Sequence, residues 1–201
     1  MPQDPARPNQ PPEPSFKQRD ASSYDPVADD WPWPSELLDP GDAVIAEALL
    51  AAADVHDDRR LAERALRMLG WLTDLETRPG HLSPVPVGGL RRGGHPIGSE
   101  QRPVSVAALS AAAARALRLT GDRRWEGPVV DAAGWYAGAN DVGAVMFDRD
   151  TFRSYDALRR DGPVPDQGAE AAVSFTMVLR ELQRLRQRRT RSAPTDTGPR
   201  G

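Results

Sequence analysis

Apolar residues recur every three or four positions along most of residues 31–189, which is the spacing of amphipathic helices. Five stretches follow this period, and none shows the two-residue alternation of a half-buried strand. The pattern therefore predicts an all-α fold. The predicted helices are Ala43–Ala53, a second with Leu61, Ala65, Met68, Leu69, Leu72 and Leu75 on one face, Val104–Leu119, Trp125–Ala137 and Ala169–Arg188.

The last predicted helix combines an apolar face with many arginines. The arginines between Arg180 and Arg191 suggest nucleic-acid binding, but no aromatic residues are interleaved with them and the chain is acidic overall. A solvated helix end near the negative pole of the helix dipole is the better interpretation. The core face of this helix is predicted to contain Phe175, Val178, Leu179, Leu182 and Leu185.

The links between the predicted helices alternate between short and long. Asp57-Asp58 and Thr120-Gly121-Asp122 are short enough to close antiparallel helix pairs, with Gly121 ending one helix and Asp122 capping the next. The links over residues 77–102 and 138–167 are much longer, although residues 147–160 could hold a sixth helix. We expect an α/α hairpin array in which both long loops lie at one end and form the ligand face.

Composition and charge narrow the possible partners. Residues 1–30 and 190–201 are rich in proline and polar residues and are predicted to be disordered tails around one domain at 31–189. The net charge of −3 gives no global attraction to nucleic acid or anionic lipid. The longest apolar run, Ala43–Ala53, is interrupted by Glu47 and is too short to span a membrane. Without cysteine, and with no signal-peptide pattern, a cytoplasmic protein is expected.

No metal or other cofactor is implied by the sequence. The chain has three histidines, His56, His81 and His95, which are too scattered for the close ligand spacing of a typical metal site. The glycine-rich stretch at 88–94 lacks the strand-to-helix setting of a phosphate loop, so we interpret it as an ordinary mobile loop.

The junction Asp166-Gln167-Gly168-Ala169-Glu170 concentrates carboxylates, an amide and a glycine where a loop meets a helix. Unpaired N–H groups at a helix N-terminus favour such polar groups, which could orient a polyhydroxylated ligand. The simpler alternative is that Asp166 or Gln167 caps the helix and Glu170 favours its positive end.

Several polar motifs occur in an order that matches the hairpins and loops. They are Asp30-Trp31-Pro32-Trp33-Pro34, Gly80-His81-Leu82-Ser83-Pro84-Val85, Glu100-Gln101-Arg102-Pro103, Asn140-Asp141-Val142-Gly143, Tyr155-Asp156-Ala157-Leu158 and Gln167-Gly168-Ala169-Glu170. Over residues 30–185 this set resembles the six-hairpin, (α/α)6-toroid carbohydrate-active proteins, especially the toroid modules associated with bacterial glycosyltransferases.

The resemblance implies that the chain corresponds to the C-terminal half of such a toroid. A half ring exposes apolar flanks that a closed ring would bury, so a partner chain completing the toroid is expected. The resemblance also implies an oligosaccharide or sugar ligand and glycosyltransferase- or glycosidase-type chemistry. The alternative is a non-catalytic helical interaction module that docks a glycosyltransferase or the missing half-toroid.

Carbohydrate chemistry directs attention to loop carboxylates and aromatic rings. Glycosidic cleavage uses an acid and a second carboxylate, and Glu100, Asp156 and Glu170 are the candidates for these catalytic roles. For each of them the alternative is an ordinary solvated carboxylate. The candidate substrate-binding residues are Trp33, His81, Asp166 and Gln167, with packing as the alternative for Trp33 and a structural hydrogen bond as the alternative for His81.

Overall fold

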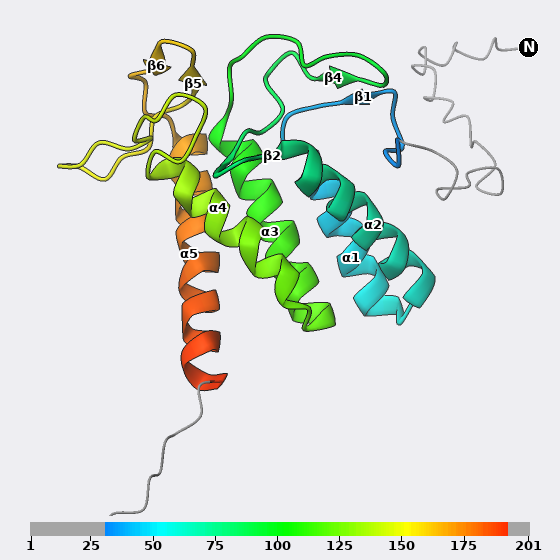
Figure 1. Cartoon of the computed structure of the whole chain (residues 1–201). Coiled ribbons are helices and arrows are strands. Elements are labelled where there is room, and N and C mark those ends of the chain that lie inside the picture. The colour runs from blue at the N-terminus through cyan, green and yellow to red at the C-terminus, as the bar shows by residue number, and fades with distance from the viewer. Residues whose placement is uncertain (1–30, 193–201) are drawn as a thin grey trace, which may run out of the picture.

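The computed structural model describes residues 31–192 of the 201-residue chain, so the predicted tail at 1–30 and residues 193–201 of the predicted tail at 190–201 lie outside this range. Five α-helices dominate the described part, as the apolar period predicted (Figure 1). A helical turn at Arg123–Trp125 precedes the fourth helix. The helices are α1 (Ala43–His56), α2 (Arg59–Glu76), α3 (Pro103–Thr120), α4 (Glu126–Tyr136) and α5 (Ala169–Ser192).

The two short links end and begin helices as predicted. Asp57 adopts a left-handed conformation after α1, and the Asp58 side chain accepts a hydrogen bond from the Leu61 amide at 3.0 Å. Gly121 closes α3 with φ +71° and donates its N–H to Leu117. Asp122 then accepts from the amide of Arg124 at 3.0 Å, so it caps the turn at Arg123–Trp125, whereas α4 itself begins without a side-chain cap. Each link therefore reverses the chain and closes an antiparallel helix pair.

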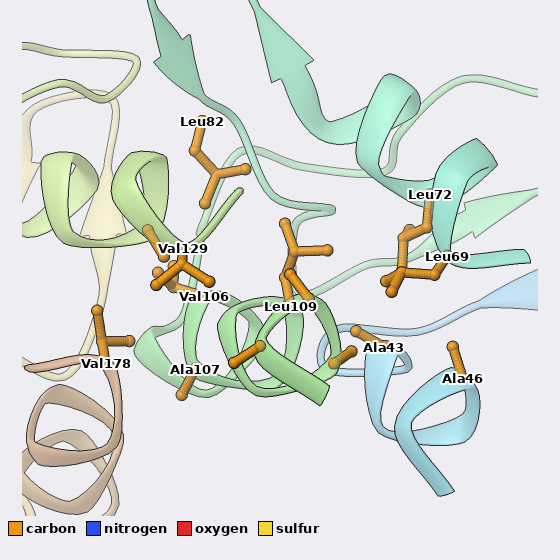
Figure 2. Packing of buried hydrophobic residues seen from close by; sticks show 14 of the residues in the cluster. Ala43, Ala46, Leu69, Leu72, Leu82, Val106, Ala107, Leu109, Val129 and Val178 are labelled. Carbon is orange, nitrogen blue, oxygen red and sulfur yellow. The ribbon is translucent and has the colours of Figure 1, made fainter. Parts of the chain in front are cut away.

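The helices pack in two layers. Helix α3 lies between α1 and α5, while α2 packs on α1 and α4 packs on α3 and α5. Buried alanines at Ala107, Ala112, Ala113 and Ala116 make α3 narrow, so its neighbours can approach closely. Figure 2 shows side chains from both layers meeting at α3, with Leu109 near its centre. The all-α class is confirmed, whereas membership of a larger toroid stays a prediction.

Two details of α5 differ from the prediction. Leu179, expected in the core, is 45% exposed, whereas Ser174 and Glu181 are buried. The helix contacts α3 and α4, so its buried face follows those two neighbours rather than its most apolar residues. The helix also continues to Ser192, beyond the predicted tail boundary at 190.

The two long links, and the segment before α1, contain short strands that the sequence pattern did not predict. Strand β1 (Leu37–Leu38) pairs with β4 (Leu90–Arg91), β2 (Thr77–Arg78) with β3 (His81–Leu82), and β5 (Leu158–Arg159) with β6 (Gly162–Pro163). Strands of two residues are too short to show a periodic pattern. The possible sixth helix at 147–160 is wrong, because this segment consists of turns and bridges that lead into β5.

Both long loops lie at the same end of the helices, as predicted (Figure 1). Gln101, at the end of the first loop, exchanges two backbone hydrogen bonds of 2.9 Å with Leu158 of the second. Leu82 of the first loop points into the core near Val106 and Val129, so the loops are anchored to the helices as well as to each other (Figure 2). Residues distant in the sequence thus meet at this end.

Within residues 31–192, no helix combines the length and apolar character needed to cross a membrane.

Candidate ligand-binding site

Gln101 is the structural centre of the loop end. Its side chain is only 4% exposed, and its backbone is fixed by the paired hydrogen bonds to Leu158. The indole Nε1 of Trp135 on α4 donates to its Oε1 at 3.0 Å. Because a donor occupies the amide oxygen, the amide nitrogen must point the other way, toward Asp141. A core tryptophan therefore sets the orientation of a polar group in the loops.

Asp141 collects hydrogen bonds from three separate segments of the chain. Its Oδ2 accepts from Gln101 Nε2 at 2.6 Å and from Ser83 Oγ at 3.0 Å, and its Oδ1 lies 2.9 Å from His81 Nε2. Asn140 fixes the turn that carries Asp141, because its amide donates to the carbonyl oxygens of both ends of that turn at 2.7 Å. We call His81, Ser83, Gln101 and Asp141 the loop cluster.

The order of contacts in the loop cluster decides what chemistry it can support. In a nucleophilic triad the imidazole lies between the carboxylate and the hydroxyl, so that it removes the hydroxyl proton. Here the Asp141 carboxylate lies between His81 and Ser83. Ser83 is therefore not activated by the imidazole. The cluster instead presents fixed hydrogen-bonding groups, which suits recognition of polar ligand atoms.

A pocket of about 330 Å³ opens beside the loop cluster. This volume is at the low end of the range for small-molecule sites, about 300–1,000 Å³. Ser83, Gln101 and Asp141 contribute polar groups to the pocket, and aliphatic side chains and prolines provide most of the rest. Its lining comprises Leu75, Arg78, Ser83, Pro84, Val85, Pro86, Leu90, Pro96, Gly98, Ser99, Gln101, Asp141, Val142, Leu158, Arg159 and Arg160.

One wall of the pocket is held by a buried carboxyl group. The amide of Val85 donates to Glu76 Oε1 at 2.9 Å, and the amide of Ser83 donates to the Glu76 carbonyl at 2.7 Å. Burial raises the pKa of Glu76 to about 7, although the Val85 hydrogen bond opposes this rise. Glu76, the last residue of α2, thus holds Ser83 through its backbone and Val85 through its side chain.

Glu100, a predicted catalytic residue, is adjacent to Gln101 but does not line the pocket. Its carboxylate accepts from Arg159 Nε at 2.7 Å and pairs with Arg102 at 3.3 Å. The Arg159 hydrogen bond, assisted by Arg102, keeps the pKa of Glu100 below its ordinary value. A carboxylate held in its ionised form is a poor proton donor at neutral pH, so this geometry favours a structural role.

The predicted residues around α5 form a helix cap rather than a pocket. Asp156 accepts the Gly168 N–H at 2.5 Å, and a Cβ at Gly168 would lie about 3.0 Å from the Asp156 carboxylate. The cap is therefore Asp156, and the expectation that Asp166 or Gln167 provides it is wrong. The backbone carbonyl of Asp166 accepts the Asp156 N–H at 2.9 Å, while Glu170 is exposed on the first turn. None of these five residues lines the pocket.

Trp33 is also absent from the pocket lining. It is 2% exposed, donates its indole N–H to Asp42 at 3.1 Å and lies 6.0 Å from the ring of Trp71. The packing alternative is therefore correct for Trp33, and its face is not available for a sugar ring. Of the four predicted substrate-binding residues, the structure brings only His81 into the loop cluster, where it contacts Asp141 but does not line the pocket.

Three members of the loop cluster were not selected as site residues from the sequence. Ser83, Gln101 and Asp141 belong to the polar motifs of the long loops, but glycosidic chemistry requires an acid–base pair and so favours Glu100 over its neutral neighbour. One feature of the sequence could have identified these three residues. Each is a polar residue on a long loop, close to a residue that shapes the backbone. Pro84 follows Ser83, Asn140 precedes Asp141, and Gln101 lies two positions before the first residue of α3.

The chain matches no model of a known protein family, and comparison with curated proteins gives no significant match.

Proposed function

We propose that the loop pocket binds a saccharide, with the loop cluster recognising its hydroxyl groups. The observation that carries this proposal is the fixed orientation of Gln101 by buried Trp135, which places a rigid amide against Asp141 at the pocket. Amide, hydroxyl and carboxylate groups together offer both donors and acceptors, as a sugar hydroxyl requires. The earlier resemblance to carbohydrate-active toroids supports the same class of ligand.

Binding without bond cleavage is the form of this proposal that the geometry supports best. Asp141 is the only carboxylate among the described residues that line the pocket. Glycoside cleavage usually employs two carboxyl groups on opposite sides of the scissile bond. The same lining contains no aromatic ring, so the C–H face of a sugar would contact Pro84, Pro86 or Val142. We therefore expect recognition of a short sugar unit.

The proposal is tested by calorimetric titration of the full chain with glucose, mannose, galactose and their di- and trisaccharides. Asp141→Asn and Ser83→Ala should weaken binding about 10- to 100-fold, because each removes a hydrogen-bonding group worth about 1–3 kcal/mol. Asp54→Asn is the matched control, since Asp54 is exposed near the far end of α1. Absence of binding by every sugar, or unchanged affinity in both cluster variants, would overturn the proposal.

A second candidate function is docking of a partner chain, and the outer face of α5 is the observation that favours it. Val173 and Leu179 are exposed there, and a shallow groove of about 340 Å³ runs past Thr176, Met177 and Arg180. Exposed apolar patches of this kind often mark protein interfaces. In this hypothesis the partner is the missing half of a toroid, which would cover α5 and bury its apolar side chains.

Size-exclusion chromatography with light scattering tests the second candidate. The chain should form a larger species with a partner that supplies the remaining hairpins, and Val173→Glu with Leu179→Glu should abolish it. Arg60→Glu, at an exposed position on α2, is the control. Complex formation that is unaffected by the α5 variants would exclude this face as the docking surface.

A further inference from the structure

We infer that the saccharide bound in the loop pocket carries an anionic group, which is held by arginines at the pocket. This inference rests on the proposed saccharide site and specifies its ligand class. Three arginines, Arg78, Arg159 and Arg160, line the pocket, compared with one carboxylate, Asp141. The chain as a whole has a net charge of −3, so this local excess of cations does not follow from the overall composition.

The ion pairs around the pocket leave two of these arginines without a carboxylate partner. Arg159 is paired with Glu100 at 2.7 Å. Arg78 donates one N–H to the Leu75 carbonyl at 3.3 Å, and neither Arg78 nor Arg160 forms a salt bridge within residues 31–192. Their remaining guanidinium donors are therefore available to a ligand, and such donors suit carboxylate or phosphate groups.

The Asp141 carboxylate does not neutralise these arginines directly. Its two oxygens already accept from Gln101, Ser83 and His81, and no arginine is bonded to it among the described residues. The pocket thus combines two kinds of chemistry. The loop cluster provides groups that can recognise hydroxyls, whereas the arginines provide positive charge that can recognise an anion.

The arginines reach the pocket from two different hairpins. Arg78 belongs to the β2–β3 hairpin, and Arg159 and Arg160 follow one another in the β5–β6 hairpin. The backbone pairing of Gln101 with Leu158 joins the second hairpin to the loop cluster. A ligand with both hydroxyls and an acidic group can therefore use the loop cluster and the arginines together. A uronate and a sugar phosphate share this chemistry.

Calorimetric titration of the full chain with glucose, glucuronate and glucose 6-phosphate tests the inference. One or both acidic sugars should bind at least about tenfold more tightly than glucose, because a charge-assisted hydrogen bond is roughly twice as strong as a neutral one. The acidic sugar that gains more identifies the anion as carboxylate or phosphate. Arg78→Gln with Arg160→Gln should remove the gain. Arg67→Gln, at an exposed position on α2, is the matched control.

The possible failures can be told apart. Equal affinity for glucose and both acidic sugars would overturn the inference and leave the saccharide proposal intact. Inorganic phosphate binding as tightly as glucose 6-phosphate would also overturn it, because the sugar would then contribute nothing. If the arginine variants retained the full gain, the anion would have to be bound elsewhere. Failure of all three sugars, together with the neutral oligosaccharides, would overturn both proposals.

Discussion

The loop end and the helical body of this protein stabilise buried carboxyl groups in opposite ways. In the body, Glu126 pairs with Arg123 and Arg189, and Glu181 pairs with Arg118 and Arg184. At the loop end, the side chain of Glu76 instead accepts a hydrogen bond from a backbone amide. The pKa of Glu126 is lowered, chiefly by the Arg189 hydrogen bond, whereas burial raises the pKa of Glu76 to about 7.

This difference separates the parts of the molecule where ion pairs join helices from a part where a buried carboxyl group has no arginine partner among the described residues. The ion pairs that Glu126 and Glu181 form with arginines link α5 to α3 and α4, and each pair neutralises the charges of its two members. The loop end also has an ion pair, Glu100 with Arg159, but within residues 31–192 it leaves Arg78 and Arg160 at its pocket without carboxylate partners. The buried charges of the helical body are therefore paired, whereas the candidate site has arginines that lack a carboxylate partner in this part of the chain.

The largest expected effect that tests this comparison is the pH dependence caused by Glu76. Its folded-state pKa is raised from 4.5 to about 7, so the folded protein retains a proton that the unfolded chain releases. The stability contributed by this group is therefore complete below about pH 4.5 and is lost as pH rises through 7. The total loss is about 3 kcal/mol. Urea unfolding between pH 5 and 8 measures it.

Glu76→Gln should remove this loss, because glutamine resembles the protonated carboxyl group and retains an acceptor for the Val85 amide. The variant should be more stable than wild type at pH 8 and nearly equal to it at pH 5. If the two proteins showed parallel stability profiles over this range, Glu76 would not retain its proton on folding, and the proposed contrast with Glu126 would be lost.

Trp135→Phe should produce the next largest effect, a destabilisation of about 2–3 kcal/mol. The change removes part of a buried ring and leaves Gln101 Oε1 without its donor. Trp125→Phe is the control, because Trp125 is equally buried and its Nε1 has no hydrogen-bond partner among the described residues. Urea unfolding should show a smaller loss for Trp125→Phe. Equal losses would show that the Trp135 hydrogen bond adds nothing.

The helices and their short connections could be predicted because their signals are local. The apolar period gave five helices, and Asp57-Asp58 and Gly121-Asp122 showed where two of them end and begin. Leu179 was misplaced because neighbouring helices, rather than residue type, decide which face of α5 is buried. The two-residue strands were missed because they are too short to show a periodic pattern, and β1 and β4 also pair across more than 50 residues of sequence.

The meeting of the two long loops was predictable, whereas the candidate pocket lies away from the favoured junction at Asp166–Glu170 and its members were predicted only in part. The two long loops do meet, and His81 belongs to the cluster they form. Gln101 could not be ranked above Glu100 from the sequence, since its importance depends on Trp135, which lies 34 residues away. Similarly, Trp33 resembles an exposed sugar platform in sequence, but its contact with Trp71 on α2 requires the folded structure.

In the helical body, Glu126→Gln should have a smaller effect on stability, and the pH dependence of this effect should be opposite to that of Glu76. This change weakens charge-assisted hydrogen bonds to Arg123 and Arg189 and should cost about 1.5 kcal/mol at pH 7. Because the pKa of Glu126 is lowered on folding, its contribution is present above about pH 4.5 and is lost as pH falls. The gap between variant and wild type should therefore close in acid. A gap that widened in acid would contradict the assignment.

The smallest expected effect tests which carboxylate caps α5. Asp156→Ala should destabilise the protein by about 1 kcal/mol, because the Gly168 N–H would lose its acceptor at the positive end of the helix. Asp166→Ala removes an exposed carboxylate that makes no side-chain hydrogen bond among the described residues, so it should change stability by less than about 0.5 kcal/mol. Thermal unfolding of both variants decides between them. The reverse order would restore the cap that the sequence alone favoured, and it would leave Asp156 free to act as a site residue.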